Sequence, residues 1–413
     1  MRKLLCVLLT LISVSVMAQK ECGTTAYLHQ VGATIAMSTP MLEEVTSTQQ
    51  PTGISSQTII YIPVVVHVVY NDAQTNISDA QIFSQIDALN KNFNRENEDF
   101  QKVPAVFAKV AAGANIRFVL AKVDPSGRAT SGITRTKTSR LMWSNDDKIK
   151  NPADGGVAPW DAKSYLNIWV CNTVPGLLGY SSAPGGDPKK DGVVIKSSLF
   201  GVTGNGSFGL GRTAVHEVGH WLNLKHLWGD AACGSDEVDD TPQQKTFNQG
   251  APSFPLINGG CSANNPFGDM FMNFMDFTND AAMMMFTQGQ VSRMRNLFGN
   301  GGVRQSILTS KALGEPWNIT PASSTPETTT AIPVASLRLY PNPVIDKLTI
   351  TVSGEGTAQG TPFAIFAADG RLMQTGKMAG PAQTLSLSGW NRGLYFVRMG
   401  NERSPQVMRF MKQ

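Results

Sequence analysis

The sequence predicts a mixed α/β domain followed by a small all-β sandwich. A β-branched run at 59–70 precedes an amphipathic helix and several more strands, which is typical of a mixed sheet covered by helices. A short helix expected to start near 209–212 and to end at 222 carries closely spaced histidines beside that sheet. From residue 337 onward the pattern changes to short strands separated by turns.

Residues 1–18 have the features of a secretory signal peptide. Arg2 and Lys3 precede an apolar core, and we expect cleavage after Ala18. No later segment reaches 18 apolar residues, so we expect no transmembrane segment. The net charge of +4 and the absence of a long basic run disfavour nucleic acid as a partner. We therefore expect an exported, monomeric protein in which disulfides can form.

Residues 19–58 are polar and lack a periodic apolar pattern, which favours a pro-segment over a domain. Its notable residue is Cys22, within Lys20–Thr24. A thiolate is a good zinc ligand, so Cys22 could block a catalytic zinc ion and keep an enzyme latent. A spare thiol or a disulfide partner is the alternative.

The elements of the first domain follow from periodicity. The continuous apolar run at 59–70 indicates a strand buried on both faces, in which we expect His67 to be packed or hydrogen-bonded. Ser78 and Gln81 form a capping-box pattern that starts a helix ending near Phe93. Cys171 is expected to be a buried thiol within a strand. Further strands are expected at 116–123, 133–137, 165–171, 177–181 and 192–195, and a helix at 286–298.

The helix before residue 222 holds the strongest chemical signal. His216 and His220 are four residues apart and therefore share one helical face, where both can bind one Zn²⁺. His226 can join them only if the chain leaves the helix near Asn223, a residue type that tolerates a left-handed turn. Three protein ligands leave one position open for water, and Glu217 is the natural base for it.

The alternative is a surface helix that carries these histidines by chance. However, this stretch holds three of only five histidines in the chain, which favours zinc.

Residues 229–270 are irregular and rich in Asp, Gly, Asn and Pro. Cys233 and Cys261 bracket this region, and a disulfide between them would stabilise it by roughly 3 kcal/mol. Asp236, Asp239 and Thr241 lie close together in the sequence, and clustered carboxylates suit Ca²⁺ in an exported protein. A solvated acidic loop explains the cluster equally well.

A linker rich in Pro, Thr and Ser is expected at 312–334, followed by the sandwich at 335–413. Asp369-Gly370 is a hairpin-turn signal within the sandwich. We expect no chemistry in this domain, which has no histidine. Its strands are expected at 337–340, 347–352, 363–366, 384–387, 394–399 and 407–410.

The stretch His216–His226, followed by Asn273–Phe277, resembles the metzincin metalloproteases, and most closely the pappalysin family with its cytophagalysin and ulilysin-like members. The resemblance implies a metzincin-type catalytic domain at 59–311, with zinc on His216, His220 and His226. It implies that Glu217 is the general base and that Met275 is the Met-turn residue beneath the metal. It also implies that Cys22 blocks the zinc in a latent form and that Cys233 and Cys261 are bridged.

Two residues depart from the family pattern. Asn223 replaces the usual Gly, and Phe277 stands where a Tyr commonly stabilises the tetrahedral intermediate. A second family bridge would need a cysteine where this chain has Ala281. Arginine-preferring members carry an acidic residue after the Met-turn, and Asp280 would fill that place in the S1′ pocket.

The C-terminal part, with Leu339–Pro343 and Gly393–Val397, resembles the type IX (Por) secretion sorting domain of Bacteroidetes. It implies export by the type IX machinery, with the protein released or attached to the cell surface. The sequence thus predicts a secreted, latent zinc metalloendopeptidase that cleaves protein or peptide substrates. A non-catalytic binding protein or adhesin on the same fold is the alternative, which the intact Glu217 disfavours.

Overall fold

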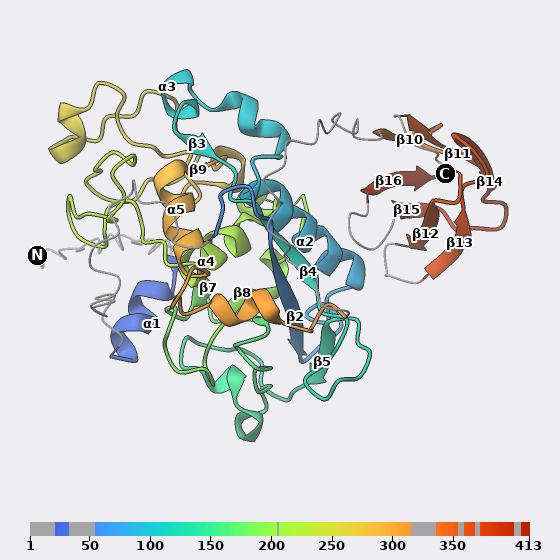
Figure 1. Ribbon diagram of the computed structural model, residues 1–413, viewed down its shortest axis with the longest axis horizontal. Helices are drawn as coiled ribbons and strands as arrows, with labels where there is room; N and C mark the ends of the chain where they lie inside the picture. Colours follow the sequence, from blue (N-terminus) through green and yellow to red (C-terminus); the bar gives the residue numbers. More distant parts are fainter. Residues whose placement is uncertain are drawn as a thin grey trace, which may run out of the picture.

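The computed structural model describes residues 21–32, 54–204, 206–314, 336–353, 359–367, 372–399 and 406–413. The predicted signal peptide, residues 315–334 of the predicted linker and the Asp369-Gly370 turn lie outside these ranges. The expected fold class is confirmed, since a mixed α/β part is followed by antiparallel β-sheets (Figure 1). Within the described ranges, every helix is too short or too polar to span a membrane.

The first part alternates strands and helices. Its helices are α1 (Thr24–Gln30), α2 (Asp79–Phe93), α3 (Ala105–Ala108), α4 (Arg212–Trp221) and α5 (Gln288–Asn296). Its strands are β1 (Glu21–Cys22), β2 (Ile60–Tyr70), β3 (Ala111–Ala112), β4 (Ile116–Leu120), β5 (Ile133–Lys137), β6 (Leu166–Cys171), β7 (Leu177–Ser181), β8 (Val193–Lys196) and β9 (Phe286–Thr287).

The long strand β2 is the centre of the main sheet. The strand order is β1-β7-β8-β6-β2-β4, and β5 also pairs with β2. The first half of β2 pairs with β4 and the second half with β5, both in parallel, while β6 lies along its other side. All pairs of this sheet are parallel except β7 with β8. A largely parallel sheet needs cover on both faces, which explains why β2 and β6 are apolar nearly throughout.

Alternation along the strands separates two hydrophobic clusters. Leu166, Ile168 and Val170 of β6 join the large cluster that also contains apolar residues of α2 and α4. Trp169 and Cys171 belong instead to a smaller cluster, as expected for side chains that point to opposite faces of a strand. Helix α4 is therefore held against the sheet on the side of the main core.

The expected start of α2 is confirmed. The Ser78 side chain accepts a hydrogen bond from the Gln81 backbone N–H at 3.2 Å. The Gln81 side chain donates to the carbonyls of Ser197 and Phe200. This residue therefore ties the helix to the loop after β8.

His67 lies in β2, fully buried, and its ring nitrogens contact Thr134 Oγ1 at 2.8 Å and Asn167 Oδ1 at 3.1 Å. Burial lowers its pKa to about 4, so the ring is neutral near pH 7. The expectation of a hydrogen-bonded, structural histidine is confirmed.

A buried ion pair fixes the end of α4. Arg304 and Asp191 are both nearly inaccessible and meet at 2.9 Å. The Arg304 guanidinium stacks over the Trp221 ring and donates to the Trp221 carbonyl at 3.1 Å, while the Trp221 indole donates to Asp191 at 3.0 Å. These contacts hold the last residue of α4 to the loop before β8.

The C-terminal part is built from two facing sheets. One has the order β10-β11-β14 and the other β13-β12-β15-β16. Apolar side chains of both sheets share one hydrophobic cluster, as in a sandwich. The strands are β10 (Ser336–Tyr340), β11 (Lys347–Ser353), β12 (Pro362–Ala367), β13 (Leu372–Lys377), β14 (Ala382–Ser386), β15 (Gly393–Met399) and β16 (Gln406–Lys412).

Three features differ from expectation. Residues 21–30 form β1 and α1, which are too short for a periodic pattern and depend on contacts with the main domain. Ala312, expected at the start of the linker, is buried and accepts hydrogen bonds from Lys122 and Val123 backbone N–H groups, so the chain packs on the first part beyond residue 311. Strand β13 was not expected, because Gln374, Thr375 and Gly376 give it little strand signal.

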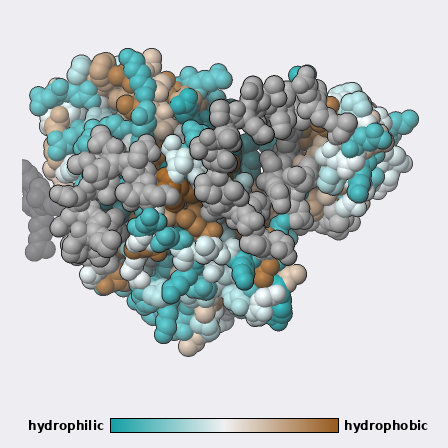
Figure 2. All heavy atoms as spheres, viewed as in Figure 1, coloured by the Kyte–Doolittle hydropathy of each residue, from teal (hydrophilic) through white to brown (hydrophobic). Residues whose placement is uncertain are grey.

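The surface in Figure 2 is largely hydrophilic, with hydrophobic residues gathered near α3. Phe254, Ile257 and Phe267 are among the exposed apolar residues, and Phe254 packs edge-on against Phe107 of α3.

Replacing Arg304 with Ala should destabilise the protein by about 3–5 kcal/mol, because the Asp191 carboxylate would stay buried without its partner. Arg128→Ala is the matched control, since the Arg128–Asp124 pair is exposed on the arginine side and should cost less than about 1 kcal/mol. Urea unfolding of both variants measures the two free energies. Equal losses would mean that the buried pair does not hold α4 in place.

Candidate metal centre

Helix α4 places two histidines on one face. It starts after Gly211, which has the left-handed φ of 75°. The Asp280 carboxylate accepts hydrogen bonds from the backbone N–H groups of Leu210 at 2.8 Å and Arg212 at 3.2 Å, which caps this helix end. All ten residues of α4 are buried, so His216 and His220 face the interior of the domain.

The chain leaves α4 through a left-handed turn at Asn223, as expected. Asn223 has a φ of 75°, and the Leu224 backbone N–H donates to the Gly219 carbonyl at 3.0 Å. The Arg293 guanidinium holds the turn by donating to the Asn223 carbonyl at 2.6 Å. This turn returns His226 to the face of α4 that carries the other two histidines.

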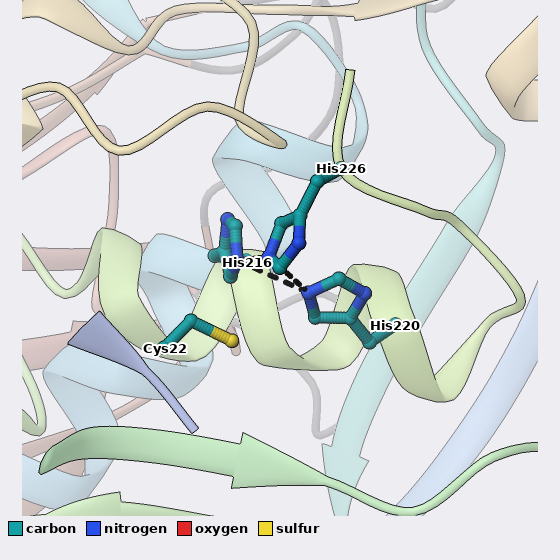
Figure 3. A group of neighbouring side chains, drawn as sticks. All are labelled: Cys22, His216, His220 and His226. Carbon is teal, nitrogen blue, oxygen red and sulfur yellow. Dashed lines mark hydrogen bonds between the residues drawn. The ribbon is translucent and has the colours of Figure 1, made fainter. Parts of the chain in front are cut away.

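The three imidazoles converge through their Nε2 atoms (Figure 3). Their separations are 3.0 Å for His220–His226, 3.1 Å for His216–His220 and 3.2 Å for His216–His226. A tetrahedral ion with bonds of ~2.0–2.1 Å would separate its ligand atoms by roughly 3.3 Å, so the spacing fits a shared metal ion.

Each outer nitrogen of the three rings has its own partner. His216 Nδ1 contacts the Phe274 carbonyl at 2.7 Å, and His220 Nδ1 contacts the Leu224 carbonyl at 2.8 Å. His226 Nδ1 contacts Asp230 Oδ1 at 2.6 Å. Acceptors at Nδ1 place the ring proton there and leave Nε2 as a free lone pair, which is the form that binds metals.

Burial also favours neutral rings. It lowers the pKa of His216 to about 3, and it lowers the pKa of His220 well below the usual range, with further lowering by the neighbouring imidazoles. Three lone pairs that face one another in a buried site repel unless a cation lies between them. The donor set therefore fits a metal ion.

Cys22 of strand β1 completes the group. Strand β1 pairs in parallel with β7, which aligns Cys22 with Gly179. Its Sγ and the nitrogens of the three histidines all lie within 4.8 Å of one another, and Figure 3 shows the sulfur pointing toward the imidazoles. Burial raises the pKa of the thiol well above its usual range, and Glu217 raises it further, so only a bound cation would favour a thiolate here.

Glu217 faces the same space and is 1% exposed. Its Oε2 accepts a hydrogen bond from the Thr24 hydroxyl at 2.7 Å, whereas Oε1 has no hydrogen-bond partner. Burial raises the pKa of this carboxyl to about 7. Thr24 also accepts from the Ser181 backbone N–H at 2.9 Å, so the Thr24 hydroxyl links Glu217 to strand β7.

Met275 lies directly against α4. A Cβ atom added to Gly219 would lie 2.6 Å from Met275 Sδ, so this close approach requires glycine at 219. The Met275 backbone N–H donates to Asn273 Oδ1 at 2.9 Å, and Asn273 is paired with the Gln290 side chain. The Met275 sulfur thus packs against α4, and the hydrogen bonds of Asn273 hold the turn that carries Met275.

A pocket adjoins His216 and Glu217. Its walls include Leu178, Phe208 and Met283, and its polar residues include Asp280. Asp280 Oδ1 is buried without a hydrogen-bond partner, and burial raises the pKa of this carboxyl to about 6.

Phe277 lines the same pocket and packs against two of the histidine rings. Its centroid lies 5.6 Å from that of His216 and 4.8 Å from that of His226. A phenyl ring therefore occupies the place where the resemblance leads one to expect a hydroxyl.

The remaining predicted residues lie outside the histidine cluster. Cys233 and Cys261 are joined in a disulfide with a Cα–Cα distance of 5.8 Å, whereas Cys171 is a buried free thiol. The Thr241 hydroxyl donates to Asp236, whose pKa burial raises to about 7. Asp239 is exposed, and calcium at this loop stays a prediction.

Sequence reasoning missed the partners of the predicted ligands. Asp230 is four residues after His226, a spacing that would have suggested it. Thr24 follows Cys22 by two residues, but its bond to Glu217 depends on the pairing of β1 with β7. The contacts with the Phe274 and Leu224 carbonyls could not be predicted, because every residue type has a backbone carbonyl.

The chain matches two families of known proteins. Residues 154–299 match the family described as pregnancy-associated plasma protein-A, and residues 338–413 match the secretion system C-terminal sorting domain. An extracellular metalloprotease of Pyricularia oryzae is 30% identical over 255 residues, which cover 59% of this chain and 76% of that protein. A second, from Arthroderma otae, is 29% identical over 57% of this chain and 76% of that protein.

Solved structures give a stronger likeness. Mature mirolysin of Tannerella forsythia in complex with a cleaved peptide is 48% identical, with a TM-score of 0.61 over 63% of this chain and 99% of that chain. A mutant of promirolysin from the same organism is 49% identical, with a TM-score of 0.59 over 61% of this chain and 84% of that chain.

Asp230→Ala should weaken Zn²⁺ binding by about 10–100-fold, because the His226 ring would lose the acceptor that orients it. Asp187→Ala, at an exposed loop aspartate, is the control and should leave the affinity unchanged. Competition with a chromogenic chelator measures both affinities. If the Asp230 variant kept the parent affinity, the carboxylate would have no role in holding the ring.

Proposed function

Because the chain belongs to the pappalysin family of metalloproteases, we propose that His216, His220 and His226 hold a catalytic zinc ion and that Glu217 is the general base. The convergence of three Nε2 atoms beside the unpartnered Oε1 of Glu217 is the observation that carries this proposal. The protein is a secreted or cell-surface metalloendopeptidase, and its C-terminal part is a type IX sorting domain.

The chemistry of the donor atoms favours zinc over other common metals. Ca²⁺ and Mg²⁺ prefer oxygen ligands, whereas three imidazoles and a thiol suit a borderline-soft tetrahedral ion. Three histidines leave one coordination position for water or substrate once the thiol has gone.

The residues around the site have different roles in the reaction. Zinc, when bound, would supply a Lewis acid that polarises the scissile carbonyl and lowers the pKa of a water molecule. Glu217 lines the pocket and its Oε1 has no hydrogen-bond partner, so this carboxylate can accept a proton from the attacking water and pass it to the leaving amine. The Nδ1 contacts keep the three rings in the ligand orientation throughout.

The adjoining pocket is suited to a long basic side chain. Its apolar walls would cover the methylene groups of an arginine, and Asp280 Oδ1 would accept from the guanidinium. We therefore assign Asp280 to the S1′ pocket, in keeping with the arginine preference of related enzymes.

The pro-segment at 19–58 accounts for latency. Cys22 Sγ occupies the open side of the histidine cluster, and Thr24 binds the carboxylate that has to move protons. Both groups must leave before a peptide can reach the site. The likeness to promirolysin supports this assignment.

Glu217→Gln should lower peptidase activity by about 1,000-fold or more, because the amide cannot take up the proton, while the zinc content stays at one ion per chain. Glu98→Gln, at an exposed glutamate, is the control and should keep full activity. Casein hydrolysis and metal analysis of the processed protein give the two readouts. Substantial activity in the Glu217 variant would rule out this residue as the base.

Cys22→Ser in the full-length chain should produce activity without prior removal of the pro-segment, because a hydroxyl is a much weaker zinc ligand than a thiolate. Cys171→Ala removes the other free thiol of the described residues, which lies in the core, and should leave latency intact. The rate of hydrolysis of a quenched-fluorescence peptide, measured before any processing is visible on a gel, compares the two. Unchanged latency in Cys22→Ser would contradict the role of the thiol.

A further inference from the structure

Helix α1 inserts one aromatic side chain into the main domain. Tyr27 is 2% exposed, and its hydroxyl donates to Asp147 Oδ2 at 2.9 Å. Its ring packs at a tilt on Tyr180, with the centroids 4.9 Å apart, and the Lys150 ammonium lies 5.1 Å from the ring centroid. We call the surrounding residues Asp147, Lys150, Trp169 and Tyr180 the Tyr27 socket.

The Tyr27 socket contains charges that the proposed peptidase chemistry does not use. Lys150 and Asp147 are at most 9% exposed and meet at 2.8 Å. Lys150 also donates to the Lys190 carbonyl at 2.7 Å and lies 5.3 Å and 5.1 Å from the ring centroids of Trp169 and Tyr180. The free energy spent on desolvating such a pair can exceed the gain from its attraction, so stability alone does not account for its presence.

The polar groups of the socket match a phenol. Asp147 supplies an acceptor for its hydroxyl, and Lys150 lies near the face of its ring. The Tyr180 hydroxyl stays buried without a hydrogen-bond partner when Tyr27 is in place, so the polar match to the phenol rests on Asp147 and Lys150. A phenylalanine would fill the same space but would leave Asp147 Oδ2 without this donor.

Tyr27 is also the main contact of the pro-segment beyond the metal centre. Together with Leu28 it belongs to the smaller hydrophobic cluster, whose other buried members all come from the main domain. The His29 and Gln30 side chains that follow are exposed. Tyr27 and Leu28 therefore supply the apolar attachment of α1, and Tyr27 adds a hydrogen bond to Asp147 that is separate from the contact of Thr24 with Glu217 at the metal centre.

We propose that the Tyr27 socket is a tyrosine-binding site, separate from the metal ligands, that holds the pro-segment and accepts a tyrosine-containing peptide once the pro-segment has left. The second half of this statement rests on the proposed removal of the pro-segment. The occupant is a peptide with the sequence of Glu21–Val31, which would run along β7 in the direction of β1. The released pro-segment would then bind the processed enzyme as a separate molecule.

The first experiment measures peptide binding without the thiol. Synthetic peptides of residues 21–31 carry Cys22→Ser, and are made with Tyr27, Tyr27→Phe or Tyr27→Ala. Their dissociation constants for the processed form of the secreted protein are measured by fluorescence anisotropy, with and without a zinc chelator. We expect the Phe peptide to bind about 10-fold more weakly and the Ala peptide about 100-fold more weakly than the Tyr peptide.

Asp147→Asn in the processed protein should reduce the difference between the Tyr and Phe peptides, because the charged acceptor is lost. Asp154→Asn, at an exposed aspartate nearby in the sequence, should leave the difference unchanged. Equal affinities of the Tyr and Ala peptides for the parent protein would overturn the proposal.

The second experiment uses the full-length chain with Glu217→Gln, which keeps the pro-segment attached. Tyr27→Ala should raise the rate at which iodoacetamide labels Cys22 by about 100-fold, while Tyr27→Phe raises it by about 10-fold. His29→Ala, on the exposed side of α1, should change it by less than about 2-fold. Peptide mapping distinguishes Cys22 from Cys171, and the urea midpoint shows whether each variant is folded.

The two experiments distinguish the socket from the metal centre. The labelling of Cys22 is also measured with and without a zinc chelator. If Cys22 does not bind metal, chelation will not change its labelling rate, while the peptide affinities still report on the socket. Equal labelling of the parent, Tyr27→Phe and Tyr27→Ala, with all three folded, would overturn the role of Tyr27 in holding the pro-segment.

Discussion

The left-handed turn at Asn223 is the constraint on which the metal centre depends. A straight continuation of α4 would carry His226 away from His216 and His220. The turn brings the three Nε2 atoms to within 3.2 Å of one another, and its position is secured by Arg293 at the Asn223 carbonyl. The same turn presents the Leu224 carbonyl to His220 Nδ1. The backbone conformation of Asn223 thus places His226 in the metal centre and also orients the ring of His220.

The support for α4 comes from segments that are distant in the sequence. Asp280 caps its first turn, Met275 packs against Gly219 in its last turn, and Arg304 stacks on Trp221 at its end. All three follow the irregular region that contains the Cys233–Cys261 disulfide. The helix that carries the histidines is thus held by single residues from the chain beyond that region, through one apolar contact and two sets of buried polar contacts.

The sequence predicted the features that depend on local spacing. The interval between His216 and His220 indicated a shared helical face, and the Asn at 223 indicated the turn, both of which the structure contains. The strands β2 and β4 to β8 were predicted because each is a short apolar or β-branched run bounded by turn residues, whereas the two-residue strand β3 was not. Helix α1 and the contact of Thr24 with Glu217 were not found, since they arise only when β1 pairs with β7. Phe274 contributes a carbonyl, which any residue type would supply.

The central position of β2 has a consequence for the rate of folding. Its partners β4, β5 and β6 all follow much later in the chain, and parallel pairing excludes a local hairpin for any of them. A sheet built this way must close long loops before its contacts form, so it folds slowly compared with local topologies. In the sandwich, by contrast, β10–β11, β12–β13 and β15–β16 are antiparallel neighbours in sequence. The two parts therefore differ in how far apart along the chain their first paired strands lie.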